Sequence, residues 1–248
     1  MTKSSAFGTL LQMGVRQVES TPIVGTITGD GNATFTMTMS GMTGSPLAMS
    51  VAVLNGDTPD TVATKAVAAM NLTANFAAKC VATCSGAVVY VTAILAAAND
   101  ATMNLAYTND TCTGLTPDAT STDATAGVAL TTVAQVNDIS GPGMTADTED
   151  VTPHDQATAR DENVITILRS GEITAGLQYD PNAATHGNTS GMLQKLSGRL
   201  PAQFRVVFPG PYNWTFDGHS TGFEPSAPVD GALTADVTIK ITGAPTLV

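Results

Sequence analysis

The stretch GHSTG (218–222), near the C-terminus, has the G-x-S-x-G spacing of a hydrolase nucleophile elbow. In such an elbow the serine sits on a sharp turn between a strand and the helix that follows it. Here Ser220 is followed by Pro225 and Pro228, which exclude a helix through that segment. His219 is the serine's chain neighbour, where backbone geometry does not favour the contact that a general base needs. We therefore expect Ser220 to lie in a turn at a strand edge, without a catalytic role.

The three histidines (His154, His186 and His219) are too few and too scattered for a metal site with recognisable spacing. His154 lies beside Asp155 and could act as a general base, but the surrounding segment is polar, so we interpret it as a surface histidine. Asp30-Gly31-Asn32 resembles the start of a calcium loop, yet the later ligands and the closing glutamate are absent. A hairpin turn of the Asp-Gly kind is the simpler interpretation. No metal site is predicted.

The three cysteines (Cys80, Cys84 and Cys112) are an odd number without CxxC spacing. Residues four apart on one strand point to the same face, so Cys80 and Cys84 are predicted to be packed thiols. Secreted disulfide scaffolds carry more cysteines, in even number, and we expect reduced thiols in a cytosolic setting. The sequence also lacks a P-loop, a complete G-x-G-x-x-G and a paired-carboxylate framework. We predict no catalytic residue, no cofactor and no enzyme activity.

Charged residues make up only 12% of the 248 residues, and the net charge is −11. Polarity comes from Thr, Ser, Asn and Gly, which suits β-structure with many turns because threonine packs well on a pleated surface. A groove that binds nucleic acid by its phosphates needs basic clusters, and the sequence has none. The N-terminus lacks the apolar core of a signal peptide, and no run approaches the roughly 20 apolar residues of a membrane span. We expect a protein made inside a cell, with no membrane partner.

Two compositional textures indicate two domains. From about Thr21 to Gly127 the chain is rich in Thr, Ala, Gly and Asn, whereas the part from Val128 onward has more arginine, proline and aromatic residues. Residues 1–17 resemble the second texture. This arrangement predicts a discontinuous host domain, 1–17 and 129–248, with a domain inserted at 18–128.

Inside the insert, alternating segments and one helix signal predict the order β-β-α-β-β-β, a small α+β domain. The helix signal is Asp57-Thr58-Pro59, a capping residue followed by proline at the first helical position. An apolar stripe from Val62 to Met70 extends this helix to about Leu72. The stretch 113–129 is turn-rich and is interpreted as a linker back to the host domain. The predicted strands are 33–39, 47–53, 79–85, 87–95 and 101–108.

In the host domain, about five strands and one short helix predict a β-sandwich or a partly closed barrel. The helix is expected from Thr189 to Leu196, stopped by Gly198. The stretch from Thr145 to Asn163 is acidic and has no apolar period, so we interpret it as a long loop. A loop of this length in a compact domain is usually functional or disordered. The predicted strands come from 130–143, 172–179, 203–208, 213–216 and 233–241.

Several host segments together resemble a known family. They are SAFGTLLQMG, TTVAQVNDISGPGMTADTEDVTPHD, GEITAGLQYDPNAATHG, FRVVFPG and WTFDGHSTGFEPSAPVDGALTADVTIKITGAP. These segments resemble the major tail tube protein of long, non-contractile tailed bacteriophages, the siphophage type. The resemblance covers 1–17 and about 129–248, and its most specific parts are the ISGPG corner and the C-terminal segment. The insert departs from the minimal family pattern.

The resemblance implies a β-sandwich or barrel subunit that forms hexameric rings, which stack into a tube through which DNA passes without specific binding. It also implies the tape measure, tail terminator and baseplate or tip proteins as partners, and a virion tail assembled in the cytoplasm of the host bacterium. Family members contact the neighbouring ring with an N-terminal arm and a long loop, which correspond here to about 4–13 and 145–163. The inter-ring contact candidates are Phe7, Leu10, Leu11, Asp147, Glu149, Asp150, Asp155, Arg160, Asp161 and Glu162.

Two functions from other classes stay open beside this one. A carbohydrate-binding or adhesin-like β-module would use exposed aromatic residues, for which Trp214 and Tyr212 are the candidates. A hydrolase acting through Ser220 is disfavoured by the prolines. Because an insert cannot occupy a lumen that conducts DNA, we expect 18–128 to face outward, where its Thr/Asn-rich surface suits weak contacts with host-surface sugars or with neighbouring subunits.

Overall fold

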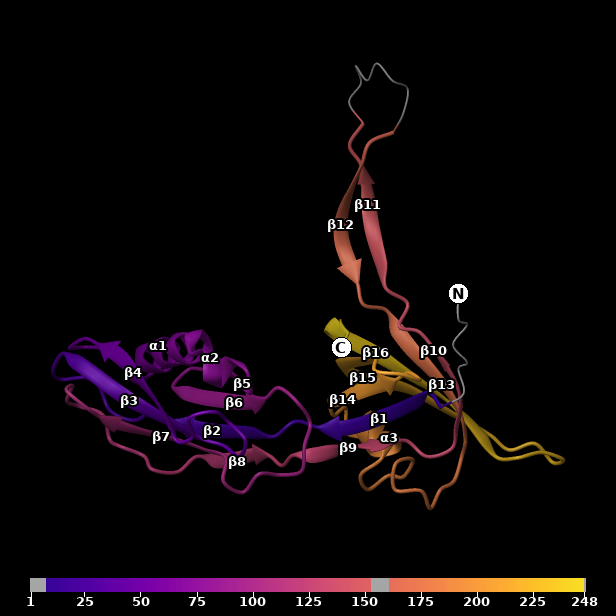
Figure 1. Cartoon of the computed structure of the whole chain (residues 1–248), viewed down its shortest axis with the longest axis horizontal. Helices are drawn as coiled ribbons and strands as arrows, with labels where there is room; N and C mark the ends of the chain where they lie inside the picture. Colours follow the sequence, from indigo (N-terminus) through magenta and orange to yellow (C-terminus); the bar gives the residue numbers. More distant parts are fainter. Residues whose placement is uncertain (1–7, 153–160, 248) are drawn as a thin grey trace. The chain divides into compact units, whose positions relative to one another are not determined.

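The computed structural model describes residues 8–152 and 161–247, and the described chain is mainly β-structure with short helices (Figure 1). Its contacts divide it into two compact units: Gly14–Ala129, called here the insert unit, and the remainder, called the host unit. Each unit has its own cluster of buried apolar residues. The predicted fold class, mainly β with a small α+β part, is confirmed.

The host unit is built on one seven-stranded sheet, in the order β10-β13-β16-β15-β14-β1-β9. The pairings β10–β13, β13–β16, β14–β15 and β15–β16 are antiparallel. Among the described strands, β10 and β9 end the sheet, so each has one edge without a partner strand. The bounds are β1 Leu10–Val15, β9 Val128–Thr132, β10 Val136–Ser140, β13 Glu172–Gln178, β14 Ala202–Val207, β15 Asn213–Ser226 and β16 Thr234–Leu247.

One face of this sheet forms the core of the host unit. Alternate residues of β13 and β16 are buried, and Ile173 pairs with Ile239 at the centre of that face. Phe204 and Phe216 pair across β14 and β15, and their rings stack with centroids 6.0 Å apart. The predicted short helix, α3 (Met192–Ser197), contacts β15 and contributes a fully buried Met192. The alternation of apolar residues in these segments therefore predicts the core correctly.

Strand β15 differs from the prediction, because it runs through GHSTG instead of ending before it. β16 pairs with β15 as far as Ser226, whereas β14 covers β15 only up to Gly218. Beyond Gly218 one edge of β15 has no partner strand among the described residues, which is where a strand tolerates a residue such as Pro225. The prolines exclude a helix, as expected, but they do not end the strand. Ser220 lies inside a strand, and the predicted turn is wrong.

The acidic stretch predicted as a long loop contains a strand and belongs to a β-hairpin. β11 (Thr145–Asp150) pairs antiparallel with β12 (Asn163–Arg169), with a register shift between Asp147 and Thr148. Neither strand is buried in the described chain. Because no face of β11 packs against a core, its sequence does not need to alternate between apolar and polar residues. The loop prediction is therefore wrong for β11, because its backbone pairs with that of β12 in an antiparallel ladder.

The insert unit contains two sheets and two helices. The predicted elements 33–39, 47–53, 59–72, 79–85, 87–95 and 101–108 are all present, and the structure adds β2, β8 and the short α2. The prediction of a linker at 113–129 is wrong in part, because β8 lies within it and pairs with β2. Val18 pairs with Thr125, so the two ends of this unit are adjacent. The sheets are β5-β6-β2-β8 and β4-β3-β7, with β2 Val18–Pro22, β3 Gly31–Thr38, β4 Leu47–Val53, α1 Pro59–Leu72, α2 Ala74–Ala77, β5 Cys80–Ser85, β6 Val88–Ala93, β7 Asn104–Asn109 and β8 Thr122–Thr125.

Buried polar groups in the insert unit have hydrogen-bond partners. The Tyr107 hydroxyl donates to the Pro22 carbonyl at 3.1 Å and accepts from the Val24 N–H at 3.0 Å, while its ring stacks on Phe35. Glu19 is only 3% exposed. Its carboxylate accepts a hydrogen bond of 2.6 Å from the Ser121 hydroxyl and another from Gln17. These pairings remove the penalty that an unsatisfied buried polar group would carry.

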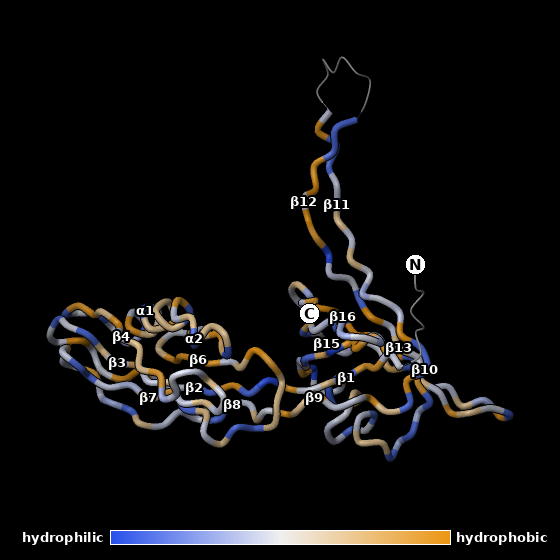
Figure 2. Tube along the Cα trace, in the orientation of Figure 1, coloured by the Kyte–Doolittle hydropathy of each residue, from blue (hydrophilic) through white to orange (hydrophobic). Residues whose placement is uncertain are grey.

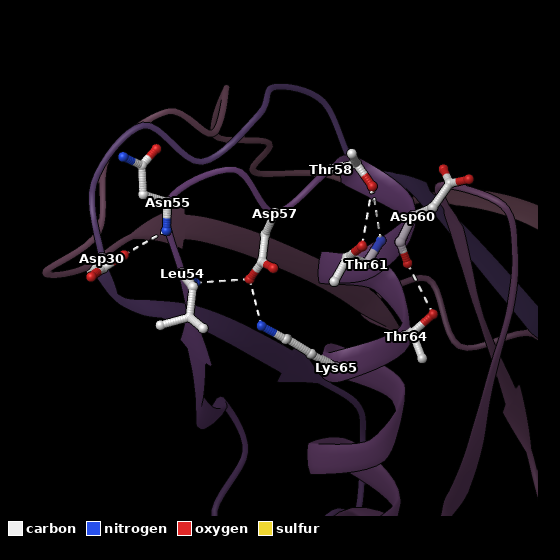
Figure 3. Close-up of polar contacts among 9 residues, drawn as sticks. All are labelled: Asp30, Leu54, Asn55, Asp57, Thr58, Asp60, Thr61, Thr64 and Lys65. Carbon is white, nitrogen blue, oxygen red and sulfur yellow. Dashed lines mark hydrogen bonds and ion pairs between the residues drawn. The ribbon is translucent and has the colours of Figure 1, made fainter.

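The start of α1 is fixed by polar contacts, as the sequence predicts (Figure 3). The Thr58 hydroxyl accepts from the Thr61 N–H at 3.4 Å, which caps the helix. One oxygen of Asp57 accepts from the Leu54 N–H at 2.8 Å and from the Lys65 ammonium at 2.5 Å. The hydrogen bond from Lys65, followed by that from Leu54, lowers the pKa of Asp57 below its usual value. The carboxylate therefore joins the end of β4 to the second turn of α1.

This depressed pKa makes the insert unit less stable in acid. A group whose pKa is lower in the folded state contributes stability above its unfolded pKa, and this contribution is lost as the pH falls through the folded pKa. We expect Asp57→Asn to cost about 0.5–1 kcal/mol at neutral pH, and to reduce the loss of stability as the pH falls below about 4. Urea unfolding of both proteins at several pH values measures this; curves that stay parallel would contradict it.

The Asp-Gly pair at Asp30 does not form the predicted hairpin turn. Gly31 opens β3 and pairs with Val53, and the Asp30 carboxylate accepts from the Asn55 N–H at 2.5 Å. A Cβ at Gly31 would lie 2.5 Å from the backbone nitrogen of Cys112. Glycine is needed here for a close backbone approach, which is a different use of glycine from the turn that we expected.

Candidate assembly interface

Strand β12 of the β11–β12 hairpin is largely hydrophobic along its length (Figure 2). All seven residues of β12 are exposed, and the exposed fractions are 50% for Val164, 63% for Ile165, 54% for Ile167 and 79% for Leu168. Burying one such side chain gains about 1.5–3 kcal/mol relative to leaving it in water. Monomeric soluble proteins rarely expose large contiguous apolar patches unless these have a binding role. β12 is therefore the strongest candidate for a contact with another molecule.

The opposite strand of the hairpin is acidic and is held to β12 by an ion pair. The Arg169 guanidinium donates to both carboxylate oxygens of Asp147, at 2.6 Å for the shortest contact, and holds the pKa of Asp147 below its usual value. Asp150 accepts from the N–H of Thr152 at 2.9 Å at the far end of the hairpin. Because both partners are exposed, the Arg169–Asp147 pair orients the two strands more than it stabilises them.

The structure brings five of the ten predicted inter-ring residues together on this hairpin. Asp147, Glu149 and Asp150 lie in β11, and Asp161 and Glu162 directly precede β12. On β1, Leu10 is 40% exposed, whereas Leu11 is fully buried in the host core. The remaining three, Phe7, Asp155 and Arg160, lie outside the described residues, as does His154.

Sequence reasoning missed the apolar residues of β12. The run NVITIL, from Asn163 to Leu168, is rich in β-branched residues and has no glycine or proline, which is the signal that identifies a strand. The run is not an obvious strand in the sequence, because polar residues flank it and its apolar residues do not alternate with a period of two. The predicted contact residues of this hairpin are acidic, whereas the larger apolar surface lies on β12.

A groove of about 600 Å³ lies along β10 in the host unit. Four consecutive residues of β10, Val136 to Ile139, line it, together with Phe208, Tyr212, Trp214 and Leu247. The pairing of β10 with β13 shifts register between Val136 and Asp138, so side-chain alternation is interrupted along this stretch, and the groove lies beside a strand that ends the sheet. We call this feature the edge groove. It brings Trp214 and the 62% exposed Tyr212, the two predicted aromatic candidates, to one place.

Ser220 and the described histidines do not form a catalytic arrangement. Ser220 is 7% exposed, and its hydroxyl has no hydrogen-bond partner among the described residues. His186 is fully buried, and its Nε2 lies 2.8 Å from the Ala134 carbonyl while its Nδ1 accepts from the Asp180 N–H at 3.2 Å. That pairing assigns the proton to Nε2 and a structural role to His186. No periodic pattern in the sequence predicts that this histidine is buried.

Replacing Ser220 with alanine is expected to leave stability unchanged or to raise it by about 1 kcal/mol. A buried hydroxyl without a partner costs about 1–3 kcal/mol, and the smaller side chain removes this cost while leaving little empty space. Thermal unfolding of the variant and the parent protein compares them directly. A loss of more than about 1 kcal/mol would show that the hydroxyl has a stabilising partner.

The cysteines of the described chain are free, and Cys80 is buried. Cys80 and Cys84 lie on the same face of β5, as predicted, and burial raises the pKa of the Cys80 thiol to about 12. A thiol with so high a pKa is a poor nucleophile and metal ligand. Within the described ranges, no three His, Cys, Asp or Glu side chains are grouped to hold a metal ion. None of the described helices is long and apolar enough to cross a membrane.

A comparison with protein families decides the class of this protein. Residues 117–248, more than half of the chain, match the family model described as the lambda phage tail tube protein. The chain belongs to this family. The match includes β10, the β11–β12 hairpin and the other strands of the host sheet except β1, and leaves out most of the insert unit. The chain is thus a structural component of a phage tail, and the resemblance noted in the sequence is confirmed.

The chain is also similar to chains in solved structures of larger particles, at low identity. One is in the virion of a native gene transfer agent particle, at 17% identity and a TM-score of 0.41, covering 48% of this chain and 88% of that chain. Another is in the tail of an empty gene transfer agent particle, at 15% identity and a TM-score of 0.39, covering 48% and 86%. A third is in the baseplate of an anti-feeding prophage, at 10% identity and a TM-score of 0.38, covering 48% and 83%. A search of curated proteins found no match.

Proposed function

We propose that this tail tube protein forms hexameric rings that stack into a tube, and that the tube conducts DNA out of the capsid. The observation that carries the proposal is β12, a seven-residue strand that is exposed throughout although it holds four large apolar side chains. Membership of the tail tube family gives this surface its use, because a tube subunit must bury area against its copies. We therefore interpret the exposed apolar area of β12 as surface that becomes buried when subunits assemble.

The open edges of the host sheet support closure into a ring. β10 and β9 end the seven-stranded sheet in the described chain, and unpaired strand edges are sites of association with other chains. A head-to-tail contact between identical subunits gives a ring when the rotation closes, and an open filament when it does not. Rings that stack also account for a second set of contacts, to which we assign the acidic hairpin residues and Leu10.

The charge of the protein suits a duct. The net charge is −11, and the sequence contains no basic cluster that would neutralise phosphates. DNA is therefore expected to slide through the tube without specific binding. We expect the tape measure, tail terminator and baseplate or tip proteins as further partners, with assembly in the cytoplasm of the host bacterium.

We assign the insert, residues 18–128, to the outside of the tube, where it is free to make weak contacts with sugars of the host surface. Its ends are adjacent, because Val18 pairs with Thr125. In the host sheet the Val133 N–H donates to the Leu11 carbonyl at 2.8 Å, and Thr131 donates to the carbonyl of Met13. If the same antiparallel spacing continues along both segments, residue 127 lies beside residue 17, and a tight turn can join the two. The insert is thus dispensable for closing the host fold.

Sedimentation velocity over a range of concentrations tests the proposal, with a variant in which Asn-Gly replaces residues 18–126. This dipeptide forms the two-residue turn that joins antiparallel strands. We expect both proteins to form large assemblies above a threshold concentration. A wild-type protein that stays monomeric would contradict the ring proposal. Assembly by the wild type without assembly by a folded deletion variant would contradict an outward, dispensable insert.

A carbohydrate-binding or adhesin-like module is the second candidate, because Trp214 and Tyr212 line one groove. Aromatic faces of this kind are amphipathic contact surfaces. Dispersed monomers whose Trp214 fluorescence responds to added oligosaccharides would favour this function over the tube.

A further inference from the structure

We infer that the edge groove is the acceptor for β12 of a second copy of this chain, which adds to the free edge of β10 as an extra strand. This inference rests on the proposed function, since it specifies which two surfaces meet when subunits assemble. The partner is a copy of the protein itself, and the contact joins unlike surfaces of the two subunits.

The shape of the edge groove fits an added strand. Val136 to Ile139 line it, and they belong to β10, the strand that ends the described sheet and therefore has a free edge. On its other edge β10 pairs with β13. The walls are largely apolar, with Phe208, Trp214 and Leu247. An extended segment that docks on a sheet edge gains backbone hydrogen bonds from the edge and places alternate side chains in pockets beside it.

β12 has the properties that such a segment needs. Its sequence, NVITILR, contains no proline to interrupt a ladder and is rich in β-branched residues. It belongs to a two-stranded sheet with β11, so its outer edge has no partner strand among the described residues. Its four large apolar side chains are at least half exposed. An apolar strand with a free edge thus matches an apolar groove with a free edge.

The chain's own β12 is prevented from filling this groove. Only Ser170 and Gly171 separate β12 from β13. Both edges of β13 are occupied, by β10 and by β16, so β12 would have to cross β10 to reach the far edge of that strand. The three residue steps from Arg169 to Glu172 span at most about 11 Å. This length is used up by two strand spacings, and none is left for the chain to pass over β10 and turn back. The occupant must therefore come from a second copy, and repetition of this contact extends to a ring or a filament.

Trp214 is the sole tryptophan of the chain and lines the groove, so its fluorescence reports whether the groove is filled. The test mixes two proteins. The first carries Ile165→Ser and Leu168→Ser, which keeps the groove and Trp214 but weakens its own β12. The second carries Trp214→Phe, which is silent in tryptophan emission but keeps β12 intact. The control is a silent protein that carries Trp214→Phe together with both serine substitutions.

We expect the Trp214 emission of the first protein to shift to shorter wavelength, and its quenching by acrylamide to fall, when the silent protein is added. The control protein should produce neither change. Association of the two proteins by sedimentation without a shift would overturn the groove assignment and leave the proposed function standing. A shift that the control also produces would show that another segment fills the groove. If wild-type protein does not assemble at all, the proposed function fails and this inference fails with it.

Discussion

Replacing Ile165 and Leu168 with serine is expected to abolish assembly of the tail tube protein while leaving the subunit folded. The two side chains are 63% and 79% exposed, so their loss removes little from the folded subunit. Substitutions at exposed positions usually change the free energy of unfolding by less than about 0.5 kcal/mol. In the proposed assembly the same side chains become buried, and each is then expected to contribute about 2 kcal/mol to the contact. Each substitution should therefore weaken subunit association by roughly 30-fold.

Sedimentation measures assembly of this variant, and thermal unfolding followed by Trp214 fluorescence measures the fold of its host unit. Leu72→Ser is the matched control, because Leu72 is 86% exposed and lies at the end of α1 in the insert unit. The control should assemble like the parent protein. If the double variant assembles at the same concentration as the parent protein, β12 is not part of the interface.

Phe35→Ala is expected to unfold the insert unit and to spare the host unit and its assembly, whereas Phe204→Ala should destroy assembly. Both phenylalanines are fully buried, each in the separate core of its own unit, and each stacks on a second aromatic ring. Truncating a buried phenylalanine to alanine costs about 3–5 kcal/mol, which is comparable to the whole stability of many domains. The different outcomes follow from the separation of the two cores.

Trp214 emission and circular dichroism together separate the two units. Trp214 belongs to the host unit, so its unfolding transition reports the host alone, while circular dichroism reports both units. Phe35→Ala should lower the temperature of the circular dichroism transition that belongs to the insert unit, or remove that transition. The temperature of the Trp214 transition should stay unchanged. Phe35→Leu, which keeps most of the apolar volume, should show a smaller effect of the same kind. A Trp214 transition that moves with Phe35→Ala would mean that the two units unfold as one.

Much of the fold follows from local patterns in the sequence. Thr58 and Pro59 mark the start of α1, because capping and the fixed φ of proline act within one turn. Alternation identifies β13 and β16, because one face of each strand is buried against the core. These signals are local or periodic, so a single sequence reveals them.

The features that the sequence did not reveal depend on distant partners. β15 runs through Ser220 and Pro225 because β16 pairs with it and β14 stops short, which only the topology determines. β11 has no apolar period because neither of its faces is buried in the described chain. His186 is buried by contacts with Ala134, which lies 52 residues away. The acidic residues of the candidate site were located by resemblance, and the apolar strand beside them by the structure.

Electron microscopy of the concentrated wild-type protein in negative stain tests the central claim most directly. The account predicts rings and tubes of uniform diameter, with six subunits around a central channel wide enough for duplex DNA and with the insert projecting from the outer wall. Dispersed single particles at every concentration, or solid filaments without a channel, would contradict it.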